Sequence, residues 1–341
     1  MKRLLIFLLC LNTVAWAQPV LRGQLVIDAR TPQEYSEGHF EGAINVPHDR
    51  LQEHLEVLPS EKARPILLYC KSGRRAAQLK AQLEERGYSQ VVNGGGLADV
   101  EKAALAEAYR WLKSRKWVDL THRFSPTTPV WEGFGPSQFR PAADPKTGRA
   151  YSLEKDGFRA THYSLVGQYG THIDPPAHFS AEGQTVDEIP IEQMILPMVV
   201  FDITPKLADH PAYELTVDDI LEWENEHGRV PEGCFAALRT DLSKDWNTNR
   251  FRRHPFPAWS PEAIRFLYQQ RGITANGHEA LDTDNTPNLE AETWLLQHGH
   301  WQVEVMTNLD QVPPTGALLV VSWPKPEKGL GFPARAFAIL P

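Results

Sequence analysis

The sequence predicts an α/β protein built from two domains. Its 341 residues exceed the usual length of one domain, which makes two the expected number. Near the N-terminus, short apolar runs of strand length alternate with a segment of helical periodicity, as in a parallel sheet covered by helices. Further along, several runs rich in β-branched residues indicate more strands, and the 27 prolines favour a loop-rich domain over a helical bundle.

Composition and charge narrow the class of partner. The chain is 42% hydrophobic and 23% charged, as is usual for a globular protein. Its formal net charge is -8 and it has no run of lysine and arginine, so we expect no nucleic-acid partner.

Residues 1–17 have the pattern of a cleavable signal peptide. Lys2 and Arg3 form a basic start, Leu4 to Val14 form an apolar run, and Ala15-Trp16-Ala17 is a small-x-small cleavage pattern. The apolar run is too short to remain as a membrane-spanning helix. We therefore expect Sec-type export to a bacterial periplasm or beyond, with cleavage after Ala17 and no membrane anchor in the mature protein.

We expect the first domain to span residues 18–100. Leu25–Arg30 and Ile66–Cys70 are apolar runs of strand length. Residues 74–87 have helical periodicity and end at a glycine, as helices commonly do. Gln90–Val92 predicts another strand, which ends where a glycine-rich stretch begins.

Residues 101–116 are expected to form a helical linker to the second domain. This stretch belongs to a charged, alanine-rich segment that starts at Leu97. Leu105, Tyr109 and Leu112 recur in it at helical spacing.

Cys70 has the surroundings of a reactive thiol. It lies where a predicted strand ends and a helix begins, so backbone N–H groups and the positive end of the helix face the sulfur. Basic residues follow directly, and each of these factors favours the thiolate. The alternative is a buried small residue, the commoner fate of a lone cysteine. Cys234 enters an apolar strand of the other domain, so we expect a core residue and no disulfide with Cys70.

The first domain resembles the rhodanese family. The likeness depends on Asp28 and Arg30, on the run from Glu34 to Pro47, and on a C-x-x-G-x-R loop that starts at Cys70. It implies a parallel-sheet α/β sulfurtransferase in which Cys70 is catalytic and carries a persulfide taken from a donor such as thiosulfate. The loop that would hold the persulfide comprises Lys71, Ser72, Gly73, Arg74 and Arg75. Some rhodanese domains serve instead as docking or regulatory modules.

Residues 117–341 are expected to form the second domain. Four apolar runs predict strands, near Phe201, Ala237 and Val320 and at 336–340. Two helices have clear start and stop signals, Thr216 to Gly228 and Ser260 to Gly272. The domain is therefore α/β or α+β with much loop.

The segment from Gly167 to Phe179 predicts a metal site. It holds His172, Asp174 and His178 in a run that two prolines keep extended. Residues two apart in an extended chain point the same way, so His172 and Asp174 should share one face, with His178 just beyond. Imidazole and carboxylate suit Zn²⁺ or Mn²⁺ and leave room for an activated water.

The second domain resembles the cyclase family of metal-dependent hydrolases, which includes bacterial kynurenine formamidase and isatin hydrolase. GQYGTHIDPPAHF is similar to the family signature H-x-G-T-H-x-D-x-P-x-H-F. Other matching features occur in order, namely Asp119-Leu120-Thr121, Thr128 to Trp131, Leu238-Arg239-Thr240 and Glu304 before Asn308-Leu309. The resemblance implies a swivelling β/β/α fold, hydrolysis of a small amide or lactone, and a homodimer in which aromatic side chains line the substrate pocket.

The resemblance also assigns roles to single residues. His172 and Asp174 are implied as metal ligands, and Glu304 as a further ligand. His178 is implied as a ligand or as the general base and acid, which would relay a proton to the leaving group. A cation there would lower the pKa of a water and polarise the scissile carbonyl. The candidate aromatic residues around the substrate are Trp131, Phe134, Tyr169 and Phe179.

Two departures from the signature leave the number and kind of ions open, one or two, Zn or Mn. Gln168 stands where the signature has its first histidine, and a glutamine oxygen is a weak ligand. Glu292, twelve residues before Glu304, stands where dizinc members have a histidine. His278, like Glu292, is a possible additional ligand; the alternative for residues 276–285 is a polar loop with a capping aspartate.

Three functional interpretations follow, and we rank them in this order. The first is an exported enzyme with a metallohydrolase and a sulfurtransferase in one chain. The second is a sulfurtransferase whose C-terminal domain only binds a ligand, which Gln168 and Glu292 favour. The third is a hydrolase whose rhodanese part is a docking module without turnover.

Overall fold

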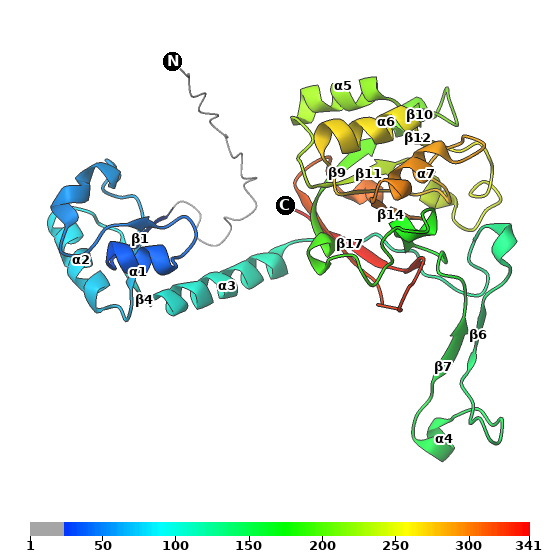
Figure 1. Ribbon diagram of the computed structural model, residues 1–341, viewed down its shortest axis with the longest axis horizontal. Helices are drawn as coiled ribbons and strands as arrows, with labels where there is room; N and C mark the ends of the chain where they lie inside the picture. The colour runs from blue at the N-terminus through cyan, green and yellow to red at the C-terminus, as the bar shows by residue number, and fades with distance from the viewer. Residues whose placement is uncertain (1–23) are drawn as a thin grey trace. The chain divides into compact units, whose positions relative to one another are not determined.

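The structure is a computed structural model that describes residues 24–341. The chain divides into two compact units, Met1–Ser114 and Arg115–Pro341 (Figure 1). The predicted signal peptide, residues 1–17, lies outside the described residues. Within residues 24–341, no helix is both long and apolar enough to cross a bilayer.

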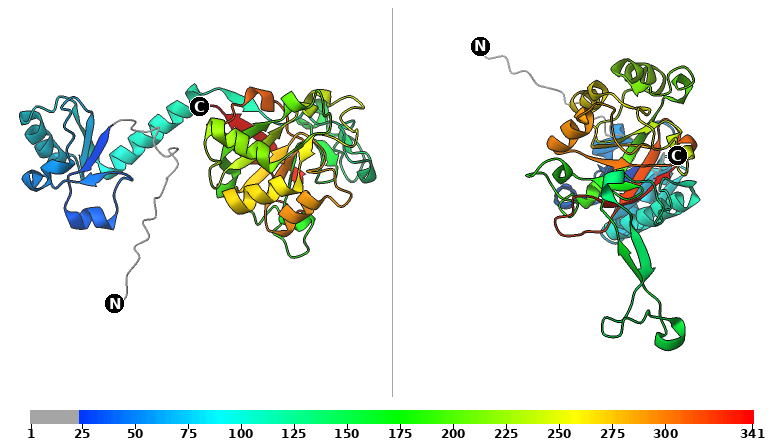
Figure 2. Two further views of the ribbon diagram at one scale, coloured as in Figure 1. Left: turned by 90° about the horizontal axis from the view of Figure 1, so that it is seen from above. Right: turned by 90° about the vertical axis from the view of Figure 1, so that its right-hand side faces the viewer.

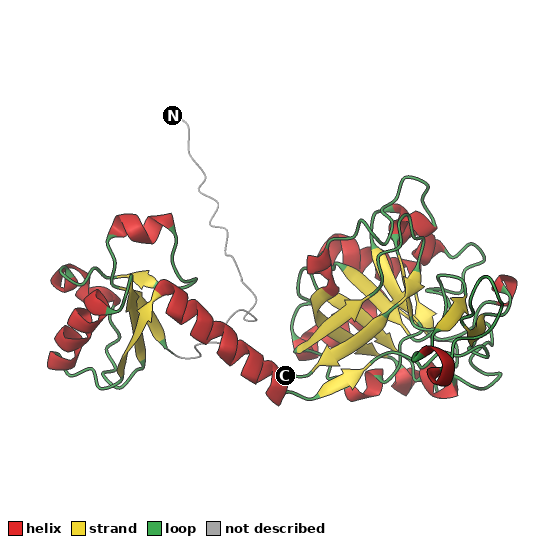
Figure 3. Ribbon diagram, turned by 90° about the horizontal axis from the view of Figure 1, so that it is seen from below, coloured by secondary structure: helices red, strands yellow, loops and turns green. Residues whose placement is uncertain are grey.

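The N-terminal unit is built on a four-stranded parallel sheet in the order β2-β1-β3-β4. Its strands are β1 (Leu25–Asp28), β2 (Ile44–Asn45), β3 (Ile66–Cys70) and β4 (Val91–Gly96). They lie among α1 (Pro32–Glu37), the 3-10 segment η1 (Leu51–Val57), α2 (Arg74–Glu85) and α3 (Leu97–Ser114) (Figure 3). Ile27, Leu68 and Leu79 are fully buried in a core that includes Cys70.

The predicted elements of this unit are present, but two strands differ in length, and β1 ends at Asp28, two residues before the predicted Arg30. β4 runs on through three glycines, so the predicted end of this strand at Val92 is wrong. Glycine is needed there because a Cβ at Gly94 would lie 2.9 Å from Val100 and 3.0 Å from Leu67. α3 occupies the stretch in which a helical linker is expected.

The C-terminal unit is built on a nine-stranded mixed sheet in the order β16-β8-β14-β13-β11-β9-β15-β17-β5. The four central strands β14, β13, β11 and β9 are parallel, and the flanking pairs are antiparallel. The bounds are β5 (Trp117–Asp119), β8 (His172–Asp174), β9 (Ile195–Asp202), β11 (Phe235–Arg239), β13 (Ala275–His278), β14 (Trp301–Glu304), β15 (Ala317–Ser322), β16 (Phe332–Pro333) and β17 (Arg335–Ile339).

Three helices pack against one face of this sheet: α5 (Val217–His227), α6 (Pro261–Phe266) and α7 (Glu290–Gln297) (Figure 1). Phe201, Ile220, Ile264 and Leu295 are buried between them and the strands. A second core lies on the opposite face, where Met198, Val303 and Leu319 are buried. The remaining 3-10 segments are η2 (Glu132–Phe134), η3 (Pro176–His178), η4 (Ile191–Met194), η5 (Thr204–Lys206), η6 (Leu242–Asp245) and η8 (Leu309–Gln311).

The predicted helix starts and strands of this unit are confirmed. Thr216 and Ser260 cap α5 and α6 through their side chains, and the π-helical segment η7 (Leu267–Arg271) carries the second helix to Gly272. The four predicted strands are β9, β11, β15 and β17. Strands β13 and β14 and helix α7 were not predicted, and all three contribute to the site below.

An antiparallel hairpin of β6 (Gln138–Pro141) and β7 (Thr161–Ser164) also lacked a prediction. It projects from the rest of the unit and carries the short helix α4 (Leu153–Asp156) (Figures 1 and 2). All four residues of β7 are exposed. A separate two-stranded sheet pairs β10 (Glu214–Leu215) with β12 (Ala258–Trp259).

Candidate active sites

The candidate metal site forms where β8 pairs with β14. The antiparallel register sets His172 opposite Glu304 and Asp174 opposite Gln302. Because side chains alternate along a strand and paired residues share a face, all four point to the same side of the sheet. Pairing with β14 thus adds a carboxylate and an amide to the face expected for His172 and Asp174.

Three possible ligand atoms converge in this cluster. Nε2 of His172 lies 3.4 Å from Oδ2 of Asp174 and 3.5 Å from Oε2 of Glu304. All three residues are buried, and one ligand atom from each lies within 4.8 Å of the others. An imidazole with two carboxylates is a donor set for Zn²⁺ or Mn²⁺.

His172 presents the atom that a cation would need. Its Nδ1 lies 2.8 Å from the carbonyl oxygen of Gly170, which can only accept, so in the neutral ring Nδ1 carries the proton. Nε2 is buried and has no hydrogen-bond partner. A buried lone pair of this kind is unfavourable alone, and a cation held between it and the carboxylates would satisfy it. These residues therefore fit a divalent cation.

The pKa values of the cluster show an excess of buried negative charge. Burial raises the pKa of Glu304 well above its usual value, and repulsion from Glu292 and Asp174 adds to the shift. Burial acts to lower the pKa of His172, but attraction to Asp174 outweighs it and the pKa is raised. Burial acts to raise the pKa of Asp174, but His172 holds it at about 2. Positive charge is favoured at this position.

A cavity of about 310 Å³ opens onto the cluster. Its wall includes three further residues from the predicted site, namely Gln168, His178 and Glu292. His178 is the most exposed of the histidines here, with 25% of its side chain accessible, and its Nε2 lies 4.0 Å from Oδ1 of Asp174. It is therefore placed to meet a molecule that enters the cavity.

Three of the four expected aromatic residues line the same cavity: Trp131, Phe134 and Phe179. Tyr169 does not. It is buried, its hydroxyl donates to the carbonyl oxygen of Ser125, and it accepts from Ser137. Tyr169 thus supports the loop that carries Trp131 and lies outside the wall of the cavity.

The residues from 276 to 285 divide between two roles. His278 lies behind the cavity wall with Nε2 3.5 Å from Oε1 of Glu304, and burial lowers its pKa to about 3. Asp282 lines the cavity. Asp284 accepts from the backbone N–H groups of Ala291 and Glu292 at the start of α7, as in the alternative of a capping aspartate. The polar loop of that alternative is wrong for residues 276–278, which belong to the buried strand β13.

Gln302 is the residue of this site that the sequence analysis missed. It is fully buried, and its Nε2 donates to Oε1 of Glu304 at 2.9 Å. Its position two residues before Glu304 on one strand was the signal available, since such residues share a face. A neutral glutamine in an apolar strand gave no chemical reason to use it.

The thiol of Cys70 lies at the end of β3, under the start of α2. The N–H of Gly73 donates to Sγ at 3.1 Å, and Gly73 has a φ of 83°, which glycine adopts readily. Burial acts to raise the pKa of Cys70, but the N–H groups of Ala76, Ser72, Arg75 and Gly73 outweigh it and the pKa is lowered. This is the environment predicted for a thiolate.

The other loop residues and the second cysteine differ from Cys70. Arg75 is bound by Glu34 through two contacts of 2.6 and 2.8 Å, while Lys71, Ser72 and Arg74 are exposed. Cys234 is buried, as Cys70 is, but its pKa shifts in the opposite direction, because burial raises it to about 12. Both cysteines are free, as expected for residues of different units.

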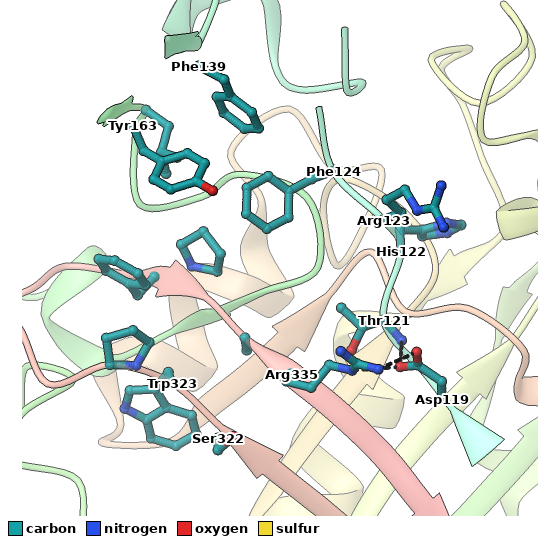
Figure 4. A pocket seen from close by; sticks show the side chains of 15 residues that line it. Asp119, Thr121, His122, Arg123, Phe124, Phe139, Tyr163, Ser322, Trp323 and Arg335 are labelled. Atoms are coloured by element: carbon teal, nitrogen blue, oxygen red, sulfur yellow. Dashed lines mark hydrogen bonds and ion pairs between the residues drawn. The ribbon is translucent and has the colours of Figure 1, made fainter. Parts of the chain in front are cut away.

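A larger cavity, of about 1140 Å³, lies between the β6–β7 hairpin and the start of β17 (Figure 4). Its wall is mainly apolar and includes the aromatic residues Phe124, Phe139, Tyr163 and Trp323. Arg335 lies at one side of it and is paired with Asp119. It contains none of the residues of the histidine–carboxylate cluster.

Comparisons with known proteins cover both units. Residues 13–103 match the rhodanese-like domain family, and residues 118–285 match the cyclase family. An isatin hydrolase from Roseibium aggregatum is 29% identical over 244 residues, which is 66% of this chain and 91% of that protein. The thiosulfate sulfurtransferase PspE from Escherichia coli is 38% identical over 87 residues, which is 26% of this chain and 84% of that protein.

Solved structures support the same assignment for the C-terminal unit. Isatin hydrolase A from Labrenzia aggregata, bound to benzyl benzoate, aligns with a TM-score of 0.62 at 33% identity over 70% of this chain and 99% of that chain. An isatin hydrolase bound to the product analogue thioisatinate aligns with the same TM-score at 26% identity, over 70% and 98%.

Fold and sites together define an α/β protein that joins a thiol-centred domain to a domain with a buried histidine–carboxylate cluster. The chain belongs to the rhodanese family in its N-terminal domain and, with the isatin hydrolases, to the cyclase family in its C-terminal domain.

Proposed function

We propose that the C-terminal domain is a divalent-metal-dependent hydrolase of a small cyclic amide or lactone. The observation that carries this proposal is the buried Nε2 of His172, which lacks a partner and faces one oxygen each of Asp174 and Glu304. The solved structures that align over this domain include isatin hydrolases, and isatin is a cyclic amide fused to an aromatic ring.

In this proposal His172, Asp174 and Glu304 hold one cation, Zn²⁺ or Mn²⁺. When bound, the cation would supply a Lewis acid for the scissile carbonyl and would lower the pKa of a water. His178 stands at the cavity wall, where its ring can take a proton from the water and deliver it to the leaving nitrogen or oxygen.

The cavity favours a flat, compact substrate. Its volume of about 310 Å³ is at the lower end for small-molecule sites. Trp131 and Phe134 pack edge to face with ring centroids 5.0 Å apart, and Phe179 packs in the same manner on His178. Aromatic walls of this kind bind an aromatic ring by stacking and exclude water from the bond to be cleaved.

We further propose that the N-terminal domain is a sulfurtransferase that takes sulfur from a donor such as thiosulfate. The Cys70 thiolate attacks the outer sulfur of thiosulfate, the S–S bond of the donor breaks with release of sulfite, and Cys70 carries the sulfur as a persulfide. The backbone N–H groups that lower the pKa of Cys70 would also stabilise the terminal sulfur of the persulfide. The thiosulfate sulfurtransferase relative is in keeping with this donor.

Export and dimer formation are also proposals. The basic and apolar pattern of residues 1–17 supports export with cleavage after Ala17, and N-terminal sequencing of the mature protein tests it. The exposed β7 strand and the mainly apolar cavity beside it support a homodimer through this face. Tyr163→Asp should then convert the dimer to a monomer in light scattering. A monomeric wild type would contradict the homodimer.

The main test is hydrolysis of isatin and related cyclic amides and lactones by metal-free protein to which Mn²⁺ or Zn²⁺ is added. We expect metal-dependent turnover of at least one of them, and a loss of at least about 100-fold in His172→Ala. His298→Ala, at an exposed histidine, serves as the matched control. Turnover that survives His172→Ala would contradict metal catalysis at this site. Thiosulfate:cyanide sulfur transfer, compared between wild type and Cys70→Ser, tests the other domain separately.

A further inference from the structure

The side chain of Gln168 turns its nitrogen, and not its oxygen, toward the metal cluster. Nε2 of Gln168 lies 2.7 Å from the carbonyl oxygen of Leu330 and 3.2 Å from Oδ1 of Asp174. Both neighbours can only accept while Asp174 is ionised, so the atom between them must be the amide nitrogen. An amide nitrogen has no lone pair to offer a cation. In this orientation Gln168 is not a metal ligand.

A segment distant in the sequence, Leu330 and Gly331, holds the Gln168 amide in this orientation. Gly331 has a φ of 153°, and a Cβ there would overlap Nε2 of Gln168. The glycine therefore lets the main chain approach closely enough for the neighbouring carbonyl of Leu330 to accept from the amide. The two N–H bonds of Gln168 are directed to Leu330 and to Asp174.

Gln302 likewise directs its amide nitrogen at the second carboxylate of the cluster, that of Glu304. Its Nε2 lies 2.9 Å from Oε1 of Glu304 and 3.5 Å from Oδ2 of Asp174. The hydroxyl of Thr283 donates to Oε1 of Gln302 at 2.6 Å, so the other end of the amide, its nitrogen, faces the carboxylates. Gln302 is fully buried, so its amide has no alternative partner in water.

The two amides divide the carboxylate oxygens into two classes. Oδ1 of Asp174 is bound by Gln168, and Oε1 of Glu304 is bound by Gln302. The opposite oxygens, Oδ2 and Oε2, are the ones that lie 3.4 and 3.5 Å from Nε2 of His172. Each carboxylate thus has one oxygen held by an amide at 2.9 or 3.2 Å, while the other is directed to the position between the three side chains. Oδ2 of Asp174 has only a longer contact, of 3.5 Å, with the Gln302 amide.

We propose that Gln168 and Gln302 are positioning residues that orient Asp174 and Glu304 so that each offers a single oxygen to the cation, and that Gln168 does not ligate it. This inference rests on the proposed metal-dependent function. Amides suit the task because they donate without adding charge, whereas lysine or arginine would neutralise the carboxylates and compete with the cation.

The test compares metal affinity with the coordination spectrum. Metal-free wild type, Gln168→Leu and Gln302→Met are titrated with Mn²⁺ by calorimetry, and each is saturated with Co²⁺ for its visible absorption bands. We expect Mn²⁺ affinity to fall about 10–100-fold in both variants, as for other residues that hold metal ligands. At saturation, the Co²⁺ bands should keep their wild-type positions, because the ligating atoms are unchanged.

Two further variants serve as the negative and the positive control for these measurements. Gln311→Leu, at an exposed glutamine, should match the wild type in both measurements. Glu304→Gln, at a proposed ligand, should shift the Co²⁺ bands. Circular dichroism checks that Gln302→Met folds, because position 302 is buried. If this variant does not fold, Gln168→Leu alone tests the positioning role.

Two outcomes would overturn the inference while leaving the proposed function intact. Shifted Co²⁺ bands in Gln168→Leu would make Gln168 a ligand. Wild-type Mn²⁺ affinity in both variants would remove the positioning role. A wild type that binds neither Mn²⁺ nor Co²⁺ would overturn the inference and the metal-dependent function together.

Discussion

Neutralising Glu304 should raise the stability of the metal-free protein and lower the stability of the metal-loaded protein, each compared with the wild type in the same state. Burial and the nearby Glu292 and Asp174 raise the pKa of Glu304 well above its usual 4.5. The folded carboxyl therefore keeps its proton to a higher pH than the unfolded one, so it lowers stability once the pH exceeds about 4.5. Glu304→Gln removes this cost and keeps an acceptor for Gln302. At pH 8 the metal-free variant should be more stable than the metal-free wild type by about 1–3 kcal/mol.

The same substitution should remove the stabilisation by metal. A cation at 100 times its dissociation constant stabilises the wild type by about 2.7 kcal/mol. For a domain of this size, each kcal/mol shifts Tm by about 2–4 °C, so Mn²⁺ or Zn²⁺ should raise the wild-type Tm by about 5–11 °C. Glu304→Gln, with one carboxylate fewer, should show little of this shift. Thermal unfolding by circular dichroism at pH 8, with EDTA or with metal, measures both effects.

Glu279 provides the matched control, since it is also a buried glutamate next to the site. Its carboxylate accepts from the N–H and the hydroxyl of Thr240 and from the hydroxyl of Ser243. Glu279→Gln would direct an amide N–H₂ at these donors, so it should lower the Tm of the metal-free protein and leave the metal-induced shift in place. Destabilisation of the metal-free protein by Glu304→Gln, or a full metal-induced shift in that variant, would refute the reasoning.

Two further predictions concern single titratable groups. Iodoacetamide at pH 7 should alkylate Cys70 and leave Cys234 unmodified in the folded protein, because the pKa of Cys234 is about 12 and only about one thiol in 10⁵ is then ionised; equal labelling by mass spectrometry would contradict this. Burial lowers the pKa of His122, stacked 4.0 Å from Trp246, to about 4. The unfolded state takes up the proton first, so His122 reduces stability as the pH falls through 6.5 toward 4, and His122→Phe should lose less stability than wild type between pH 8 and pH 5 in urea unfolding. Equal losses in the two proteins would show that His122 is not responsible.

Local pattern was sufficient to predict the parts of the site that lie close together in the sequence. Two-residue alternation places His172 and Asp174 on one face, and the strand-to-helix turn after Cys70 places N–H groups on the sulfur. Both predictions need only the geometry of one segment. Glu304 came from the family resemblance, because nothing in its own segment indicates that β14 pairs with β8.

The orientation of side chains could not be predicted in the same way. Gln168 was a candidate ligand from its place in the signature, and its amide is turned by Leu330, which is 162 residues away. Tyr169 was expected at the substrate cavity, and its hydrogen bonds to Ser125 and Ser137 hold it outside. These contacts depend on how loops from distant parts of the chain pack together, which no local pattern records.

The most direct test of the metal-dependent hydrolase is the metal content of the purified protein by elemental analysis, for wild type, His172→Ala and Asp174→Ala. We predict about one Zn or Mn per wild-type chain and a loss of that metal in both variants. A wild type that remains metal-free after incubation with both ions would contradict the account, and the C-terminal domain would then be a binding module attached to a sulfurtransferase.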